Sequence, residues 1–268
     1  MPFLNLDASP LAPGVSPVLI HYREHGSGFP LVFLHGGWGY EVYPFDAQID
    51  ALATDFRVLI PDRTGYGRST RVTRFARPFH AAGARETLAV LDALGIERAV
   101  LWGHSDGAVM AANAALFAPS RVAALILEAT HYDRRKPRSR EFFGALVTDP
   151  ETVGPRVASR LKADHGEEHW RQVLAMEGEV WVEILDGASD PAGDLFGGRL
   201  GALGVPALLL HGADDPRTEP GELDALHALV PQSRLEVLKG GGHSPHFEKV
   251  SFAECARQAR LFLKDVLV

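Results

Sequence analysis

The residue with the clearest chemical potential is Ser105, which lies in the middle of the segment GHSDG at 103–107. The spacing fits G-x-S-x-G, in which the glycines leave room for a sharp turn from a strand into a helix. The apolar run AVLW precedes this segment, and the small-residue helical pattern AVMAANAAL follows it. Ser105 alone would also suit a helix N-cap, but this context predicts an exposed nucleophile at the top of a sheet.

A serine hydroxyl needs a neighbouring base, which in turn needs an acid that fixes its tautomer. His243 follows three glycines directly after an expected strand, so a glycine loop can present its imidazole at the edge of the sheet. His211, His227 and His246 are alternatives. We favour His243, because His211 ends a strand, where packing is the expected role, and His227 falls within a helical pattern. His246 stays as the second choice.

The acid is expected in the segment HGADDP at 211–216, which follows the apolar run 207–210 at the same sheet edge. Either Asp214 or Asp215 could serve, and the other would then cap a turn, as aspartate before proline does well. The order serine, aspartate, histidine along the chain is the order that accompanies G-x-S-x-G.

These residues need a scaffold, and the chain alternates apolar runs with helical patterns. Strands are expected at 18–23, 30–35, 57–60, 99–102, 123–127, 207–210 and 235–238, and helices at 44–53, 79–94, 220–229 and 250–265. Such alternation predicts an α/β fold with a mostly parallel central sheet and helices on both faces.

The alternation fails between 131 and 203, which we interpret as a helical cap inserted into a core formed by 1–130 and 204–268. The basic run DRRKPRSR at 133–140 is expected to be a solvated face rather than a nucleic-acid site. His165 and His169 have a spacing that can bind metal on a helix, but Gly166 weakens that helix and H-E-x-x-H is absent. We therefore predict no metal site.

Bulk composition agrees with this reading. The 268 residues are 46% hydrophobic and 23% charged, which is ordinary for a globular domain. The net charge of −7 gives no sign of a nucleic-acid or anionic-membrane partner, and no apolar run approaches membrane-spanning length. With one cysteine and no signal-peptide pattern at its start, the chain is expected to be cytoplasmic.

Taken together, the motifs resemble those of the α/β-hydrolase superfamily, and in particular its carboxylesterase-like serine hydrolases with a short helical cap. HGG at 35–37, GHSDG at 103–107 and GGGH at 240–243 carry the resemblance, and DRTGYGRS at 62–69 matches the D-x-x-G-x-G-x-S segment. The resemblance implies that the acid is Asp215, the fourth residue of G-x-x-D. Asp214 stays as the alternative, because Pro220 stands one place further on than the proline that often follows.

The resemblance also implies an oxyanion hole made by the backbone N–H groups of Gly37 and Asp106. An amide at a helix N-terminus is already oriented toward a developing negative charge, which supports this choice. Related haloalkane dehalogenases and epoxide hydrolases carry aspartate at the elbow, so Ser105 favours acyl transfer instead.

The sequence therefore predicts a serine hydrolase that cleaves a carboxylic ester or related acyl bond of a small molecule through an acyl-enzyme, without a cofactor. A C–C bond hydrolase or a perhydrolase on the same triad, and a non-catalytic ligand-binding member of the fold, are alternatives. Aromatic residues that could line the pocket, although each also suits a packing role, are Trp38, Phe142, Phe143, Trp170 and Trp181.

Overall fold

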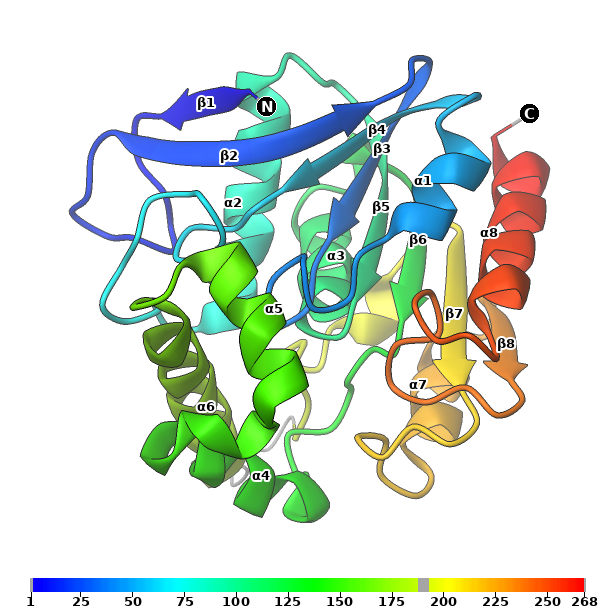
Figure 1. The fold of residues 1–268 in the computed structure, drawn as a ribbon. Coiled ribbons are helices and arrows are strands. Elements are labelled where there is room, and N and C mark those ends of the chain that lie inside the picture. Colours follow the sequence, from blue (N-terminus) through cyan, green and yellow to red (C-terminus); the bar gives the residue numbers. More distant parts are fainter. Residues whose placement is uncertain (1, 188–192, 268) are drawn as a thin grey trace.

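The computed structural model describes residues 2–187 and 193–267, and within them its central feature is an eight-stranded sheet (Figure 1). The strand order is β1-β2-β4-β3-β5-β6-β7-β8. Strands β3 to β8 pair in parallel, whereas β2 is antiparallel to both of its neighbours. The strands are β1 (Phe3–Leu6), β2 (Val18–His25), β3 (Phe29–Leu34), β4 (Phe56–Pro61), β5 (Ala99–His104), β6 (Val122–Glu128), β7 (Ala207–Gly212) and β8 (Arg234–Leu238).

Helices cover both faces of the sheet, because successive side chains of each strand point to opposite sides. Leu31 and Phe33 of β3 pack in a core with α1 (Asp46–Leu52) and α8 (Phe252–Val266). Val32 and Leu34 belong to a second core with α2 (Phe79–Ala93), α3 (Asp106–Phe117) and α7 (Glu222–Leu229). The predicted α/β class, with a mostly parallel sheet between two helical layers, is confirmed. Among the described residues, no helix is long and apolar enough to cross a membrane.

The seven predicted strands are all present, with ends that differ by a few residues, but the sequence reading missed β1. Its four residues FLNL pair with the outer edge of β2, and Phe3 remains half exposed. A short strand at a sheet edge buries little apolar surface, so its sequence carries only a weak alternating pattern.

Between β6 and β7 the chain forms α4 (Pro137–Thr148), α5 (Pro155–His165) and α6 (Trp170–Asp186). Figure 1 shows these three helices, in green, grouped on the side toward which the arrows of β3 and β7 point. Their treatment as a separate cap stays a prediction. The prediction of a solvated basic run needs a correction, because Lys136 within it is fully buried against Glu222.

The turn from β5 into α3 depends on two glycines. A Cβ atom on Gly103 would lie 2.2 Å from the carbonyl oxygen of Gly107, and one on Gly107 would lie 2.0 Å from the carbonyl oxygen of Leu34. Both distances are far below van der Waals contact, and the obstructing atoms belong to the backbone. Any side chain at either position would force β5 or β3 away from α3.

Gly107→Ala should therefore lower the free energy of unfolding by roughly 3 kcal/mol or more, as expected for severe overpacking. Urea denaturation followed by circular dichroism measures this change. Gly144→Ala on α4 is the matched control, because its Cβ would have no neighbour within 4 Å. The control should be neutral or stabilising by up to about 1 kcal/mol. Equal unfolding midpoints for the two variants would contradict the packing argument.

Candidate active site

The structure brings together three side chains that are far apart in the sequence. Nε2 of His243 lies 3.0 Å from Oγ of Ser105, and Nδ1 of His243 lies 3.0 Å from both carboxylate oxygens of Asp215. Ser105 follows β5, Asp215 follows β7 and His243 follows β8, so all three stand at the carboxyl edge of the sheet. The contacts form a hydroxyl–imidazole–carboxylate relay, the arrangement that activates a serine nucleophile.

Ser105 is held in a backbone conformation that non-glycine residues rarely adopt, with φ of 55°. Its N–H donates to the carbonyl oxygen of Glu128 at 2.9 Å, and its own carbonyl accepts from Ala108 in the first turn of α3. This conformation turns the chain at once from strand to helix and leaves the hydroxyl at the wall of a cavity.

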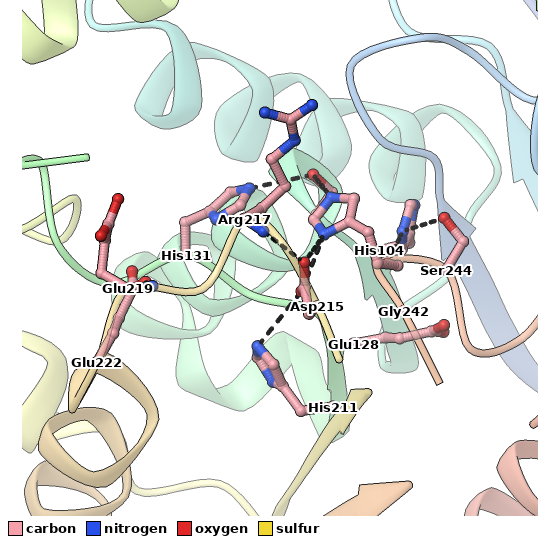
Figure 2. Close-up of polar contacts among 12 residues, drawn as sticks. His104, Glu128, His131, His211, Asp215, Arg217, Glu219, Glu222, Gly242 and Ser244 are labelled. Atoms are coloured by element: carbon pink, nitrogen blue, oxygen red, sulfur yellow. Dashed lines mark hydrogen bonds and ion pairs between the residues drawn. The ribbon is translucent and has the colours of Figure 1, made fainter. Parts of the chain in front are cut away.

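Asp215 is buried, and its carboxylate accepts hydrogen bonds from His243 and from the backbone N–H of Arg217 at 2.8 Å (Figure 2). Burial alone would raise the pKa of Asp215, but these interactions outweigh it and hold the pKa well below its usual range. Asp215 is therefore ionised, as the partner of an imidazole should be. Asp214, the alternative acid, is exposed to solvent.

A buried network fixes the loop that carries His243. Nε2 of His104 donates to the carbonyl oxygen of His243 at 2.8 Å. Glu128 accepts from the N–H of His246 and from its Nδ1, at 2.9 and 2.7 Å, and also from Nε1 of Trp102. Glu128 thus anchors the loop of His243 through its side chain and Ser105 through its backbone.

The competing histidines have other partners. His246 is buried between Glu128 and the carbonyl oxygen of Tyr43, and its ring stacks on Phe45. His227 lies on α7, where Nε2 donates to the carbonyl oxygen of Ser233. The imidazole of His211 is buried, with Nε2 4.0 Å from the carboxylate of Asp215 (Figure 2).

Gly37 and Asp106 are the residues whose backbone N–H groups are predicted to form an oxyanion hole. Both residues line the same cavity as Ser105. Among the described residues, neither N–H has a hydrogen-bond acceptor, so both donors are available to a bound molecule. Because Asp106 opens α3, its N–H also carries the positive end of the helix dipole.

Behind Gly37 lies a carboxyl pair that the sequence analysis did not identify. The side chain of Asp106 accepts from Nε2 of His80 at 2.6 Å. Burial raises the pKa of Asp106, but the interaction with His80 outweighs burial and holds this pKa well below its usual range. Glu177 of α6 accepts from the hydroxyl of Tyr66, while burial and the charge of Asp106 raise the pKa of Glu177 well above its usual range. Asp106 is therefore a carboxylate and Glu177 a neutral acid.

A second imidazole also reaches the hydroxyl of Ser105, and the sequence analysis missed it. Nε2 of His131 lies 3.3 Å from Oγ of Ser105, and its ring stacks on that of His243 with centroids 5.5 Å apart. Burial, together with the nearby charges of Lys136 and His243, lowers the pKa of His131 well below its usual range, so this imidazole is neutral. His131 follows β6. Its position just after a predicted strand, at the carboxyl edge of the sheet, could have indicated it as a site residue.

The cavity beside Ser105 has a volume of about 170 Å³ and largely aromatic walls. The predicted pocket residues Trp38, Phe142, Phe143 and Trp181 all line it, together with Tyr43. Trp170 does not. Its side chain is fully buried in the apolar core and its ring is covered by the Arg171 guanidinium, so its prediction as a pocket residue is wrong.

The segment after β6 is tied to the loop that carries Asp215. Nζ of Lys136 donates to both carboxylate oxygens of Glu222, at 2.6 and 2.5 Å, and to the carbonyl oxygen of Arg217. Glu222 also accepts from the N–H groups of Tyr132 and Asp133. This ion pair has almost no exposure to solvent, so it fixes the loop after β7 against the segment that carries His131.

His165 and His169, the predicted but disfavoured metal pair, contact the loop after β4. Nδ1 of His165 accepts from the N–H of Gly67, and its Nε2 donates to the carbonyl oxygen of Trp38. Nε2 of His169 donates to the carbonyl oxygen of Gly65. Their observed contacts join the helical segment to the loops around the cavity.

The fold and this arrangement define the class, and the alpha/beta hydrolase family model matches residues 31–256. The chain belongs to this family. It is 28% identical over 236 residues to the human serine hydrolase BPHL, covering 87% of this chain and 79% of that protein. It is 31% identical over 183 residues to an epoxide hydrolase of Caballeronia sordidicola, covering 62% of this chain and 54% of that protein.

Among solved structures, a thermophilic esterase from Thermogutta terrifontis superposes with a TM-score of 0.75 over 99% of both chains, at 21% identity. This likeness concerns the fold. The family and the relatives support a hydrolase, and the predicted superfamily is confirmed.

Buried neutral histidines make stability depend on pH. Burial lowers the pKa of His104 to about 3, and that of His165 and His211 to about 4. In the unfolded chain these imidazoles take up protons below about pH 6.5, whereas the folded protein does not. The unfolded state then binds more protons, so the free energy of unfolding should fall as the pH drops from about 6.5 toward 4.

Each such histidine contributes up to about 1.4 kcal/mol per pH unit in this window. Urea denaturation at pH 7.5, 6 and 5 measures the slope. His211→Phe should flatten the slope by up to one proton, because it removes one of these buried neutral imidazoles, and among the described residues no hydrogen bond to either ring nitrogen is lost. An unchanged slope in that variant would show that His211 is protonated in the folded protein.

Proposed function

We propose that the protein is a serine hydrolase that cleaves small carboxylic esters through an acyl-enzyme, with Ser105, His243 and Asp215 as the catalytic triad. The observation that carries the proposal is the pair of 3.0 Å contacts joining the Ser105 hydroxyl to His243 and His243 to Asp215. Ionised Asp215 holds Nδ1–H of His243, which leaves Nε2 free to accept the serine proton.

Acylation follows from these positions. Oγ of Ser105 attacks the ester carbonyl while Nε2 of His243 takes its proton, and Asp215 stabilises the resulting imidazolium. The carbonyl oxygen becomes an oxyanion that accepts from the N–H groups of Gly37 and Asp106. When the tetrahedral intermediate collapses, His243 returns the proton to the departing alcohol and the acyl group stays on Ser105.

Deacylation repeats these steps with water. His243 removes a proton from the water that attacks the acyl carbon, and then protonates Oγ of Ser105 as it leaves.

His131 supplies a further hydrogen bond to Ser105. The Ser105 hydroxyl has a single proton, which it donates to His243, so in the contact with His131 it is Nε2–H of His131 that donates to Oγ. That hydrogen bond stabilises negative charge on Oγ when the serine is the leaving group.

The size of the cavity favours a small substrate. A cavity of about 150 Å³ lined by apolar side chains accommodates benzene, and the cavity here is about 170 Å³. Its aromatic walls favour an apolar acyl group of about that size. Short p-nitrophenyl esters are therefore suitable first substrates.

Ser105→Ala should lower kcat for p-nitrophenyl acetate by roughly four to six orders of magnitude, as removal of a triad nucleophile does. Wild-type protein should react with a fluorophosphonate at Ser105, which peptide mass spectrometry locates. Ser233→Ala is the matched control, because within the described part of the chain this buried serine hydroxyl bonds only to the carbonyl oxygen of Val230, and Ser233 does not line the cavity. Near wild-type ester turnover by Ser105→Ala would refute the proposal. Activity on a dienoate without any on esters would refute its ester part.

His131→Phe should reduce kcat roughly tenfold, because it removes the donor to Oγ but keeps an aromatic ring between His243 and Trp181. The loss should fall on deacylation, so the pre-steady-state burst of p-nitrophenol persists while the steady rate drops. His131→Gln, which keeps an N–H donor, should recover part of the rate. Equal loss in the burst and in the steady phase would show that His131 has only a structural role.

A further inference from the structure

The cavity beside Ser105 contains one cationic side chain whose charge has no ion-pair partner among the described residues. Arg217 lines the cavity, and its guanidinium carbon lies 3.4 Å from the centroid of the Phe142 ring. No described carboxylate oxygen lies within 4.0 Å of its guanidinium nitrogens. Figure 2 shows this group projecting away from Asp215, although the two residues are close in sequence.

The carboxyl groups around the cavity are already engaged. Asp215 binds His243 and the backbone N–H of Arg217, Asp106 is paired with His80, and Glu177 is neutral. Burial lowers the pKa of Arg217, while the nearby charge of Asp215 only partly offsets that effect. Removing this guanidinium from water costs free energy, and among the described residues no hydrogen-bonded counter-ion offsets that cost.

The way in which Arg217 is held leaves its donors accessible. Stacking on Phe142 uses the flat face of the guanidinium, whereas the N–H groups point outward in its plane. Two parallel N–H donors in that plane match the two oxygens of a carboxylate.

Tyr43 supplies a second donor in the same cavity. Its hydroxyl has no hydrogen-bond partner among the described residues, and it is near enough to Arg217 for the two groups to interact electrostatically. Burial raises the pKa of Tyr43, so the hydroxyl keeps its proton and can donate it. The ring is fixed by stacking on Trp38 and by edge contact with His104.

We propose that Arg217 and Tyr43 form a carboxylate subsite, so that the preferred substrates are small esters that carry a free carboxylate in addition to the scissile bond. This inference rests on the proposed ester hydrolysis and names its substrate class. The carboxylate can belong to the acyl part, as in a half-ester of a dicarboxylic acid, or to the alcohol part. Both share the same recognition chemistry.

Two matched substrate pairs test the subsite on the full-length chain. Monomethyl glutarate against methyl pentanoate places the carboxylate on the acyl side, and 4-acetoxybutanoate against butyl acetate places it on the alcohol side. In each pair a carboxylate replaces a methyl group. The measured quantity is the ratio of kcat/KM for the anionic ester to that for its neutral counterpart, obtained by titration of the released acid.

Arg217→Gln should lower this ratio at least about tenfold in one of the pairs, the loss expected for a charge-assisted hydrogen bond. Arg217→Lys should retain part of the preference, since a point charge lacks the paired donors. Tyr43→Phe should cause a smaller loss. Arg140→Gln is the control, because Arg140 pairs with Asp186 on the surface and does not line the cavity.

The pair that responds to Arg217→Gln identifies the side of the ester that carries the carboxylate. A ratio that is the same in wild type and Arg217→Gln for both pairs would overturn the proposal. So would a wild-type preference for the neutral ester in both pairs. Thermal melting of each variant checks folding, and the backbone N–H of Arg217 that binds Asp215 is retained in all of them.

A binding measurement separates failure of the subsite from failure of the proposed function. Glutarate should bind the Ser105→Ala variant in calorimetry, and at least about tenfold more weakly the Ser105→Ala/Arg217→Gln double variant. If glutarate binds in this way but no ester is cleaved by wild type, the result supports the carboxylate subsite and contradicts ester hydrolysis. If esters are cleaved but glutarate binds neither variant, the result supports ester hydrolysis and contradicts the carboxylate subsite.

Discussion

The active-site geometry depends on the close packing of β5, α3 and β3 around a serine with a left-handed backbone. A residue other than glycine in this conformation costs about 1–3 kcal/mol unless its surroundings impose it. Here they do, because backbone atoms of Leu34 and Gly107 occupy the space that side chains at the two elbow glycines would need. The position of the Ser105 hydroxyl is thus determined by the sheet itself rather than by a flexible loop.

The same sheet edge holds Ser105 and the loop of His243 through Glu128, at the end of β6. Its backbone oxygen holds the N–H of Ser105, while its buried carboxylate holds His246 in the loop that carries His243. Burial would raise the pKa of Glu128, but the neighbouring histidine lowers it to about 2. The charge of Glu128 therefore helps to join the end of β5, which leads into Ser105, to the loop that carries His243.

The sequence predicted most of the strands and the three residues that meet at the carboxyl edge, because apolar runs and glycine turns are local signals. It failed where the outcome depends on distant partners. The burial of Lys136 follows from Glu222, which is 86 residues away. His131 has no motif around it, and only the alignment of β6 with β5 brings it to Ser105. Trp170 could not be separated from the pocket-lining Trp181, because both occur on one helix and only its packing distinguishes them.

The pair of Lys136 and Glu222 has a consequence for how a ligand can enter. Separating two buried, hydrogen-bonded charges costs several kcal/mol. The ion pair therefore holds the stretch from His131 to Lys136 in a fixed position relative to the sheet. Any opening of the helical segment has to pivot beyond this anchored stretch, in α4 and the helices that follow it. Phe142 lies on α4, beyond the anchored stretch, and the Arg217 backbone accepts from Lys136 within it, so an opening of α4 would separate Phe142 from the Arg217 guanidinium that stacks on it.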